Sequence, residues 1–172
     1  PMRLLADLDV EEFKQVQNVN VAGTLLGCKH GSIAMRPGGI SGRGGSIINL
    51  SSVMGLSGSI ALASYNASKG AVRLLTKSVA AECAMLKMGI RCNSIHPGII
   101  ESDMGTSFLR QLVDLGVAPD MEAAEGGFLA AVPMGESGKP QDVASGIIFL
   151  ASDASRYMTG AELVIDGGFN AT

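Results

Sequence analysis

The sequence carries little charge and almost no aromatic content. Charged residues make up 17% of its 172 residues, aromatic residues 4%, and tryptophan is absent. The net charge is −3 and the pI is near 5.3. Nucleic-acid-binding domains need a clustered basic surface, and those that bind single strands add aromatic rings that stack on bases. The composition therefore argues against nucleic acid as a partner.

Cysteine and histidine are also scarce. Cys28, Cys83 and Cys92 are odd in number and form no Cys-x-x-Cys pair. Each falls on an expected helix or strand, which favours buried free thiols over disulfides or zinc ligands. His30 is expected on a helix surface and His96 is expected to be structural, so no metal site is predicted. Free thiols indicate a reducing compartment, and we expect a cytoplasmic protein.

No targeting or membrane segment is apparent. The first residues, PMRLLADLDVEEF, have no apolar core after their single arginine, so they do not read as a signal peptide. Residues 44–68 carry no charge, but about half of them are Gly, Ser or Asn, which disfavours a spanning helix. We expect no membrane partner, and a single domain over residues 1–172.

Apolar runs at 46–51, 90–96 and 162–166 predict buried strands. They alternate with expected helices at 10–35, 64–88 and 140–152, an order that predicts an α/β fold with a parallel sheet. Residues 106–131 are expected to be mobile and partly helical. The apolar residues of this insert, together with Met54, Leu56 and Leu62, either line a ligand pocket as a lid or belong to ordinary core.

Three residues around the first strand suggest catalysis. Tyr65 and Lys69 are four residues apart on an expected helix, so they share one face. An ammonium that close is expected to lower the tyrosine pKa from about 10 and allow proton exchange near neutral pH. Ser52 follows a strand at its carboxyl end, where open α/β sheets bind ligands. The Tyr–Lys pair alone is also typical of a surface contact, and the serine favours a site.

In order and spacing, Ser52, Tyr65 and Lys69 resemble the catalytic residues of the short-chain dehydrogenase/reductase family, classical type. The resemblance extends from NVNVAGTLLGCK to YMTGAELVIDGG. It implies a Rossmann-like doubly wound sheet and an NAD- or NADP-dependent oxidoreductase that interconverts a secondary alcohol and a ketone. Tyr65 would be the general acid or base, Ser52 would bind the substrate oxygen, and Lys69 would hold the cofactor ribose. Asn20 would be a fourth catalytic residue, holding a water that connects Lys69 to solvent.

The segment HPGIIESDM resembles the family's stretch that holds the nicotinamide end of the cofactor. The resemblance places Pro97 and Gly98 at the cofactor, the Ile100 backbone on the carboxamide, and the Ser102 hydroxyl on the carboxamide or phosphate. Serine replaces the usual threonine at position 102. Without the resemblance, the segment reads as a Pro-Gly turn after a strand. The apolar lining suggests a hydrophobic or cyclic substrate, with a steroid-like skeleton as one example.

The expected helix at 64–88 is apolar or small on nearly every side, which indicates burial on more than one face. It is either a core helix or a helix that also packs on a second subunit. The resemblance favours the second interpretation. It implies a homodimer or homotetramer whose contact is formed by helices 10–35 and 64–88.

The pattern of strand, glycine-rich turn and helix that holds a pyrophosphate is not found in the sequence. The glycine-rich loop at 36–45 precedes a strand, so it is not a nucleotide loop. The resemblance covers about the last two-thirds of the family's length and implies that roughly 90 residues, or three strand–helix units, lie outside this chain. Strand 46–51 would then be a bare edge, and we expect these residues alone to be unstable or to bury it. The alternative is a non-catalytic, truncated oligomerisation or binding module.

Overall fold

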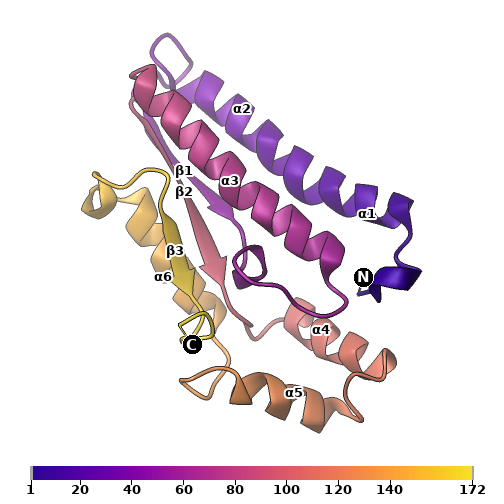
Figure 1. Ribbon diagram of the computed structural model, residues 1–172. Coiled ribbons are helices and arrows are strands. Elements are labelled where there is room, and N and C mark those ends of the chain that lie inside the picture. The colour runs from indigo at the N-terminus through magenta and orange to yellow at the C-terminus, as the bar shows by residue number, and fades with distance from the viewer. Residues whose placement is uncertain (1, 172) are drawn as a thin grey trace.

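A three-stranded parallel sheet forms the centre of the computed structural model, which describes residues 2–171 (Figure 1). The strands are β1 (Gly45–Leu50), β2 (Ile90–Pro97) and β3 (Glu162–Ile165), in the order β1-β2-β3. Ile47 lies opposite Cys92, and Ser94 lies opposite Glu162. The predicted α/β class and parallel sheet are confirmed, and each strand boundary lies within one residue of the prediction. Within the described residues β1 is an edge strand.

Helices cover both faces of the sheet, as Figure 1 shows. On one face, α3 packs on β1 and β2, and α2 packs on β1 and α3, whereas α6 packs on all three strands. Strand alternation explains the two faces: Asn49 donates to Thr76 of α3, whereas Ser46 donates to the Leu150 carbonyl of α6. These helices are α2 (Gly23–Met35), α3 (Ala63–Met85) and α6 (Pro140–Ala151).

The first long helix is not regular. Asp9 caps α1 (Val10–Gln17), because its carboxylate accepts from the N–H groups of Glu11 and Glu12. A π-helical turn, η2 (Asn18–Ala22), then separates α1 from α2. One continuous helix over 10–35 was expected, and this prediction is wrong at η2, where a π-helical turn interrupts the α-helix. The Asn20 carbonyl accepts instead from the Thr24 hydroxyl at 2.6 Å. Single π-turns often occur at functional sites.

Two helices, α4 (Asp103–Asp114) and α5 (Met121–Ala130), lie beyond the carboxyl ends of the strands (Figure 1). They face a loop that contains the short turn η3 (Val53–Gly55). A small apolar cluster joins the two regions, with Met54 and Leu62 buried and Tyr65, Phe108 and Phe169 packed against them. The 106–131 insert is therefore both a cover over the strand ends and part of a small core. The remaining short turns are η1 (Leu5–Asp7) and η4 (Asp153–Ser155).

The main core lies between α3, α2 and the sheet, and it contains polar groups. Asn49 donates to Thr76 at 2.9 Å and contacts the thiols of Cys28 and Cys92. All three cysteines are buried and free, which confirms the prediction of free thiols. No helix between residues 2 and 171 is long and apolar enough to cross a lipid bilayer.

Candidate active site

The fold brings Ser52, Tyr65 and Lys69 together at the carboxyl end of β1. Tyr65 and Lys69 lie in the first two turns of α3, and the Lys69 Nζ is 5.5 Å from the centroid of the Tyr65 ring. The ammonium donates to the Leu50 carbonyl at 2.9 Å, while the Lys69 carbonyl accepts from the Ser51 hydroxyl at 2.9 Å. These two bonds fix the start of α3 against the end of β1, so the two predicted elements meet at these side chains.

Ser52 is buried and its backbone is extended, with φ −168° and ψ 161°. Its Oγ accepts from the Met54 N–H at 3.2 Å, which caps the turn η3. A hydroxyl can donate and accept at the same time, so the O–H of Ser52 is left to donate. The Ser52 side chain is also near enough to the Tyr65 phenol to act on it, and it lowers the pKa of that phenol. The serine can thus hold a phenol, or an oxygen placed beside that phenol.

The electrostatics of Tyr65 differ from the expectation. Burial raises the pKa of the phenol, and the hydrogen bond with Ser52 opposes this only in part. Burial also lowers the pKa of the Lys69 ammonium. The prediction that Lys69 holds the tyrosine pKa below its usual value is therefore wrong for this structure. The physical reason is that both side chains are half-buried, which disfavours their charged forms.

Asn20 lies against α3 next to Lys69, but it does not reach the lysine itself. Its side-chain amide donates to the Ser68 hydroxyl at 2.9 Å, and Ser68 precedes Lys69 in the chain. Ser68 in turn donates to the Tyr65 carbonyl at 2.8 Å. The π-turn therefore places the Asn20 side chain against α3, the helix that carries Tyr65 and Lys69. A role for Asn20 in a water relay stays a prediction.

The stretch after β2 leads away from the sheet toward α4. The Gly98 N–H donates to the Ile165 carbonyl at 2.8 Å, which keeps the turn after Pro97 against β3. The Ile100 N–H has no acceptor within residues 2–171. The Ser102 hydroxyl donates to the Ile100 carbonyl at 3.1 Å and caps α4. Its position is thus explained by helix capping, and contact with a cofactor stays a prediction for Ser102.

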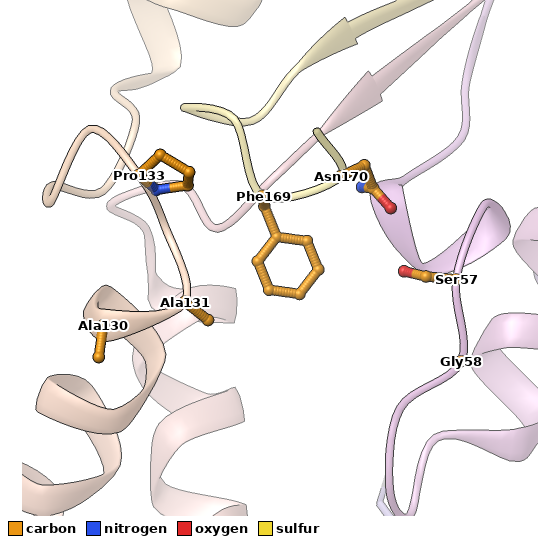
Figure 2. Close-up of a pocket in the computed structure, with 7 residues that line it drawn as sticks. All are labelled: Ser57, Gly58, Ala130, Ala131, Pro133, Phe169 and Asn170. Carbon is orange, nitrogen blue, oxygen red and sulfur yellow. The ribbon is translucent and has the colours of Figure 1, made fainter. Parts of the chain in front are cut away.

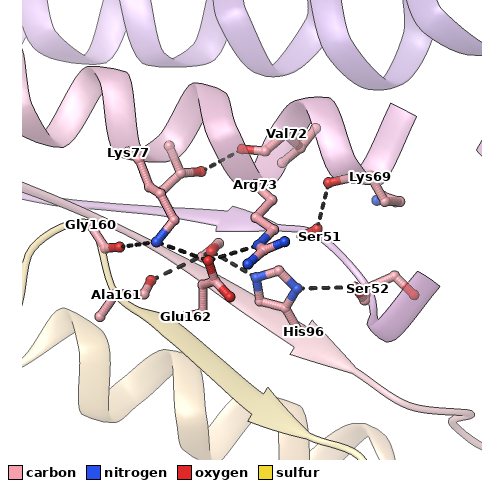
Figure 3. A network of polar contacts seen from close by, with 12 residues as sticks. Ser51, Ser52, Lys69, Val72, Arg73, Lys77, His96, Gly160, Ala161 and Glu162 are labelled. Atoms are coloured by element: carbon pink, nitrogen blue, oxygen red, sulfur yellow. Dashed lines mark hydrogen bonds and ion pairs between the residues drawn. The ribbon is translucent and has the colours of Figure 1, made fainter. Parts of the chain in front are cut away.

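His96 is a residue at this site that the sequence interpretation left as merely structural. It is fully buried, and its Nδ1 lies 3.0 Å from the Ser52 carbonyl oxygen (Figure 3). A histidine next to Pro-Gly at a strand end gives no spacing signal toward a serine 44 residues earlier. Parallel pairing of β1 and β2 is what brings the two residues together.

A pocket of about 520 Å³ opens beside the site (Figure 2). It lies between the loop after η3, the end of α5 and the C-terminal turn, and its residues are Ser57, Gly58, Ala130, Ala131, Pro133, Phe169 and Asn170. None of these side chains is charged. Phe169 stacks on Phe128 with ring centroids 5.7 Å apart and also packs in the cluster that contains Tyr65. The pocket is therefore adjacent to the candidate catalytic residues, which do not themselves line it.

Comparisons with known proteins agree on one family. Residues 2–170 match the family described as "Enoyl-(Acyl carrier protein) reductase". The chain is 41% identical over 165 residues to the NADP-dependent (R)-specific alcohol dehydrogenase of Lentilactobacillus kefiri, covering 96% of this chain and 60% of that protein. It is 40% identical over 164 residues to the inactive 2-(S)-hydroxypropyl-CoM dehydrogenase 2 of Xanthobacter autotrophicus, covering 95% of this chain and 66% of that protein.

A solved structure, described as ElxO with NADP bound, superposes with a TM-score of 0.82 at 34% identity. The match covers 100% of this chain and 64% of that one. The chain thus spans less than two-thirds of the length of the alcohol dehydrogenase and of ElxO.

Proposed function

The chain belongs to the short-chain dehydrogenase/reductase family, and we propose that the whole protein is an NAD(P)-dependent oxidoreductase interconverting a secondary alcohol and a ketone. The observation that carries this proposal is the convergence of Ser52, Tyr65 and Lys69 at one strand end, with the lysine ammonium 5.5 Å from the phenol ring. The name of the relative that is 41% identical, an NADP-dependent alcohol dehydrogenase, supports the same reaction class.

Tyr65 is the proton donor and acceptor in this proposal. A tyrosine phenol is neutral at neutral pH, and burial raises its pKa further, so it can protonate a ketone oxygen. The Ser52 hydroxyl donates to the same oxygen and stabilises negative charge as it develops. In alcohol oxidation the roles reverse, and the phenol must first lose its proton.

The residues at the strand ends fit the nicotinamide half of a dinucleotide. Within residues 2–171 the Lys69 ammonium has one acceptor, the Leu50 carbonyl, which leaves donors for ribose hydroxyls. The Ile100 N–H, which has no acceptor there, fits a carboxamide oxygen. When bound, the nicotinamide supplies or accepts the hydride. Lys69, Ile100 and the turn at Pro97 and Gly98 orient it, and Asn20 is proposed to hold a water beside Lys69.

The pocket favours an uncharged substrate. No charged side chain lines it, and the ring of Phe169 forms one of its walls (Figure 2). A charged substrate would lose hydration there without gaining an ionic partner. We propose that the alcohol or ketone carbon sits at Tyr65 and that a hydrophobic or cyclic skeleton, steroid-like at the upper limit of size, extends toward Phe169.

The outer surface of the first helix layer supports a homo-oligomer, dimer or tetramer. Val19, Leu25, Leu26 and Leu74 are all exposed on the π-turn, α2 and α3. Exposed apolar side chains on neighbouring helices are typical of a subunit contact. We propose that α1, α2 and α3 pack against the same helices of a second copy.

The whole protein tests the proposed activity directly. Titration with NADH and with NADPH, followed by nicotinamide fluorescence, should show saturable binding of at least one of them. A panel of secondary alcohols and ketones from propan-2-ol to a hydroxysteroid should then show turnover. Tyr65→Phe should lower kcat by roughly a hundredfold or more, while the control Tyr157→Phe, at a fully exposed tyrosine, should not. Turnover that survives Tyr65→Phe would remove this residue from the mechanism.

A non-catalytic binding or oligomerisation module is the second candidate, and the name of one relative favours it. That relative, 40% identical, is itself described as inactive. Absence of binding by both NADH and NADPH, together with a stable oligomer, would favour the module. The intact Ser52, Tyr65 and Lys69 weigh against it, because a chain without turnover has no need of a half-buried phenol beside a half-buried ammonium.

A further inference from the structure

His96 makes two hydrogen bonds from a fully buried position on β2. Its Nδ1 is 3.0 Å from the Ser52 carbonyl oxygen, and its Nε2 is 2.8 Å from the Ser94 Oγ. Figure 3 shows the imidazole between the loop that carries Ser52 and the strand that carries Glu162. The ring therefore connects the candidate catalytic serine to the interior of the sheet.

The partners fix the tautomer of this ring. A carbonyl oxygen only accepts, so Nδ1 must carry the proton and donate it to Ser52. In a neutral ring Nε2 then accepts from the Ser94 hydroxyl. Burial lowers the pKa of His96, and Glu162 on β3 and Arg73 and Lys77 on α3 are the charged groups that act on it. The ring stays neutral, with both nitrogens satisfied.

The bond from His96 is one of two that the Ser52 carbonyl accepts. The other comes from the Gly55 N–H at 2.9 Å. Two donors on one oxygen fix the plane of the peptide that follows Ser52. The Ser52 Oγ accepts from the Met54 N–H at 3.2 Å, which belongs to the next peptide of the same turn, so its O–H direction depends on the conformation of that turn. Loss of one donor would let the loop tilt and turn the hydroxyl away from Tyr65.

We propose that His96 is a positioning residue that holds the Ser52 peptide through its Nδ1–H, so that the Ser52 hydroxyl stays directed at Tyr65. This inference rests on the proposed function of Ser52 and Tyr65. The inference also predicts a shift in the pKa of Tyr65, which can be measured without any enzymatic turnover. The hydrogen bond from Ser52 lowers the pKa of Tyr65, so a loop released from His96 should titrate its tyrosine at higher pH.

Two amide substitutions separate positioning from core filling. The amide nitrogen of Asn occupies the place of a histidine Nδ1, whereas that of Gln occupies the place of Nε2. His96→Asn therefore keeps the hydrogen bond to the Ser52 carbonyl. His96→Gln loses that bond and keeps only the hydrogen bond with the Ser94 hydroxyl. Gln is closer to His in volume, so a role in core filling alone would favour His96→Gln. Positioning predicts the opposite order, with His96→Leu behaving like His96→Gln.

Residues 1–172 contain two tyrosines, Tyr65 and Tyr157. In the whole protein, the difference in tyrosinate absorbance between a variant and the same variant carrying Tyr65→Phe reports Tyr65 alone. His96→Gln and His96→Leu should raise its titration midpoint toward that of Ser52→Ala, and His96→Asn should match the parent. In a Ser52→Ala background the Asn and Gln variants should titrate alike. Equal midpoints for the two amides with Ser52 intact, or a shift in His96→Asn alone, would overturn the proposal. Circular dichroism at each pH confirms that the variants are folded.

Kinetics of the whole protein provide a second measurement. With an active alcohol, His96→Gln should lower kcat about tenfold with KM nearly unchanged, and His96→Asn should recover most of it. If no alcohol or ketone is turned over, the proposed function fails, and the titration still decides whether His96 positions Ser52. A Ser94→Ala variant keeps the donor toward Ser52, so it should leave the midpoint of Tyr65 in place. A shift there equal to that of His96→Leu would contradict the assigned tautomer.

Discussion

Gly55 packs directly on the backbone of Lys69. A Cβ at position 55 would lie 2.7 Å from the Lys69 carbonyl carbon and 2.9 Å from the Ser51 Oγ. Backbone atoms cannot move aside as the end of a flexible side chain can. Only glycine therefore allows the turn after Ser52 to touch α3 at the residue that carries the ammonium.

Gly55→Ala should displace this turn and with it Ser52. We expect a loss of roughly 1–3 kcal/mol in the free energy of unfolding, as for other overpacked sites, and a fall in kcat. Gly126→Ala, on α5 and outside the pocket lining, is the control, because a Cβ there meets nothing within 4 Å. Urea unfolding and steady-state kinetics measure both effects. Equal behaviour of the two variants would show that the contact with Lys69 does not hold the loop.

Tyr65 should titrate above the ordinary tyrosine value. It is half-buried, and burial raises its pKa from 10.0. The difference in tyrosinate absorbance between the whole protein and its Tyr65→Phe variant should therefore have its midpoint above 10. Because the folded pKa of Tyr65 lies above its unfolded value, the neutral phenol stabilises the fold below that unfolded value. This stabilisation is lost as pH rises through the folded pKa. A midpoint for Tyr65 below 10 would mean that the ammonium of Lys69 outweighs burial.

Glu162 should make the fold sensitive to acid. Burial acts to raise its pKa, but hydrogen bonds and charges from Arg73 and Lys77 outweigh it and hold the pKa below 4.5. These ion pairs, at 2.7 and 2.9 Å, join β3 to α3 (Figure 3). A lowered carboxyl pKa contributes stability that is present above its unfolded value and is lost as pH falls through the folded pKa.

Glu162→Gln should therefore cost about 1 kcal/mol or less at neutral pH, since the two cations are partly exposed. The difference from the parent should shrink as pH falls below 4.5. Denaturant unfolding at several pH values measures it. Glu122→Gln, at an exposed carboxyl on α5 that forms no ion pair within residues 2–171, should show no such trend. If the loss in free energy of unfolding caused by Glu162→Gln stayed constant across this pH range, the charge of Glu162 would not be the cause of that loss.

Local patterns were sufficient to predict the architecture. The apolar runs at β1 and β2 and the Pro140 start of α6 are signals within a few residues, and the structure places these elements within a few residues of the predictions. The π-turn at Asn18–Ala22 was not predicted, because one extra residue in a single turn hardly changes the spacing of apolar residues along a long helix. The two asparagines in mid-helix were its only local sign.

The site was harder to predict, because its properties depend on burial and on contacts distant in sequence. Spacing correctly placed Tyr65 and Lys69 on one helix face but gave the wrong direction for the tyrosine pKa, which follows from desolvation by the loop above it. The bond between His96 and Ser52 depends on strand pairing, which spacing along the chain does not report. The use of Ser102 as a helix cap likewise depends on where α4 begins.

The exposed apolar side chains of α2 and α3 predict self-association of the whole protein. Leu74 lies near the middle of α3 with 63% of its surface exposed, in the helix layer that also exposes Val19. Leu74→Glu would place a carboxylate in the proposed contact, where two symmetric copies would bring the charges close together. We expect a lower molar mass by light scattering coupled to size-exclusion chromatography. Ile40→Glu, in the loop before β1 at 99% exposure, should leave the mass unchanged. An unchanged mass for Leu74→Glu would move the subunit contact to another face.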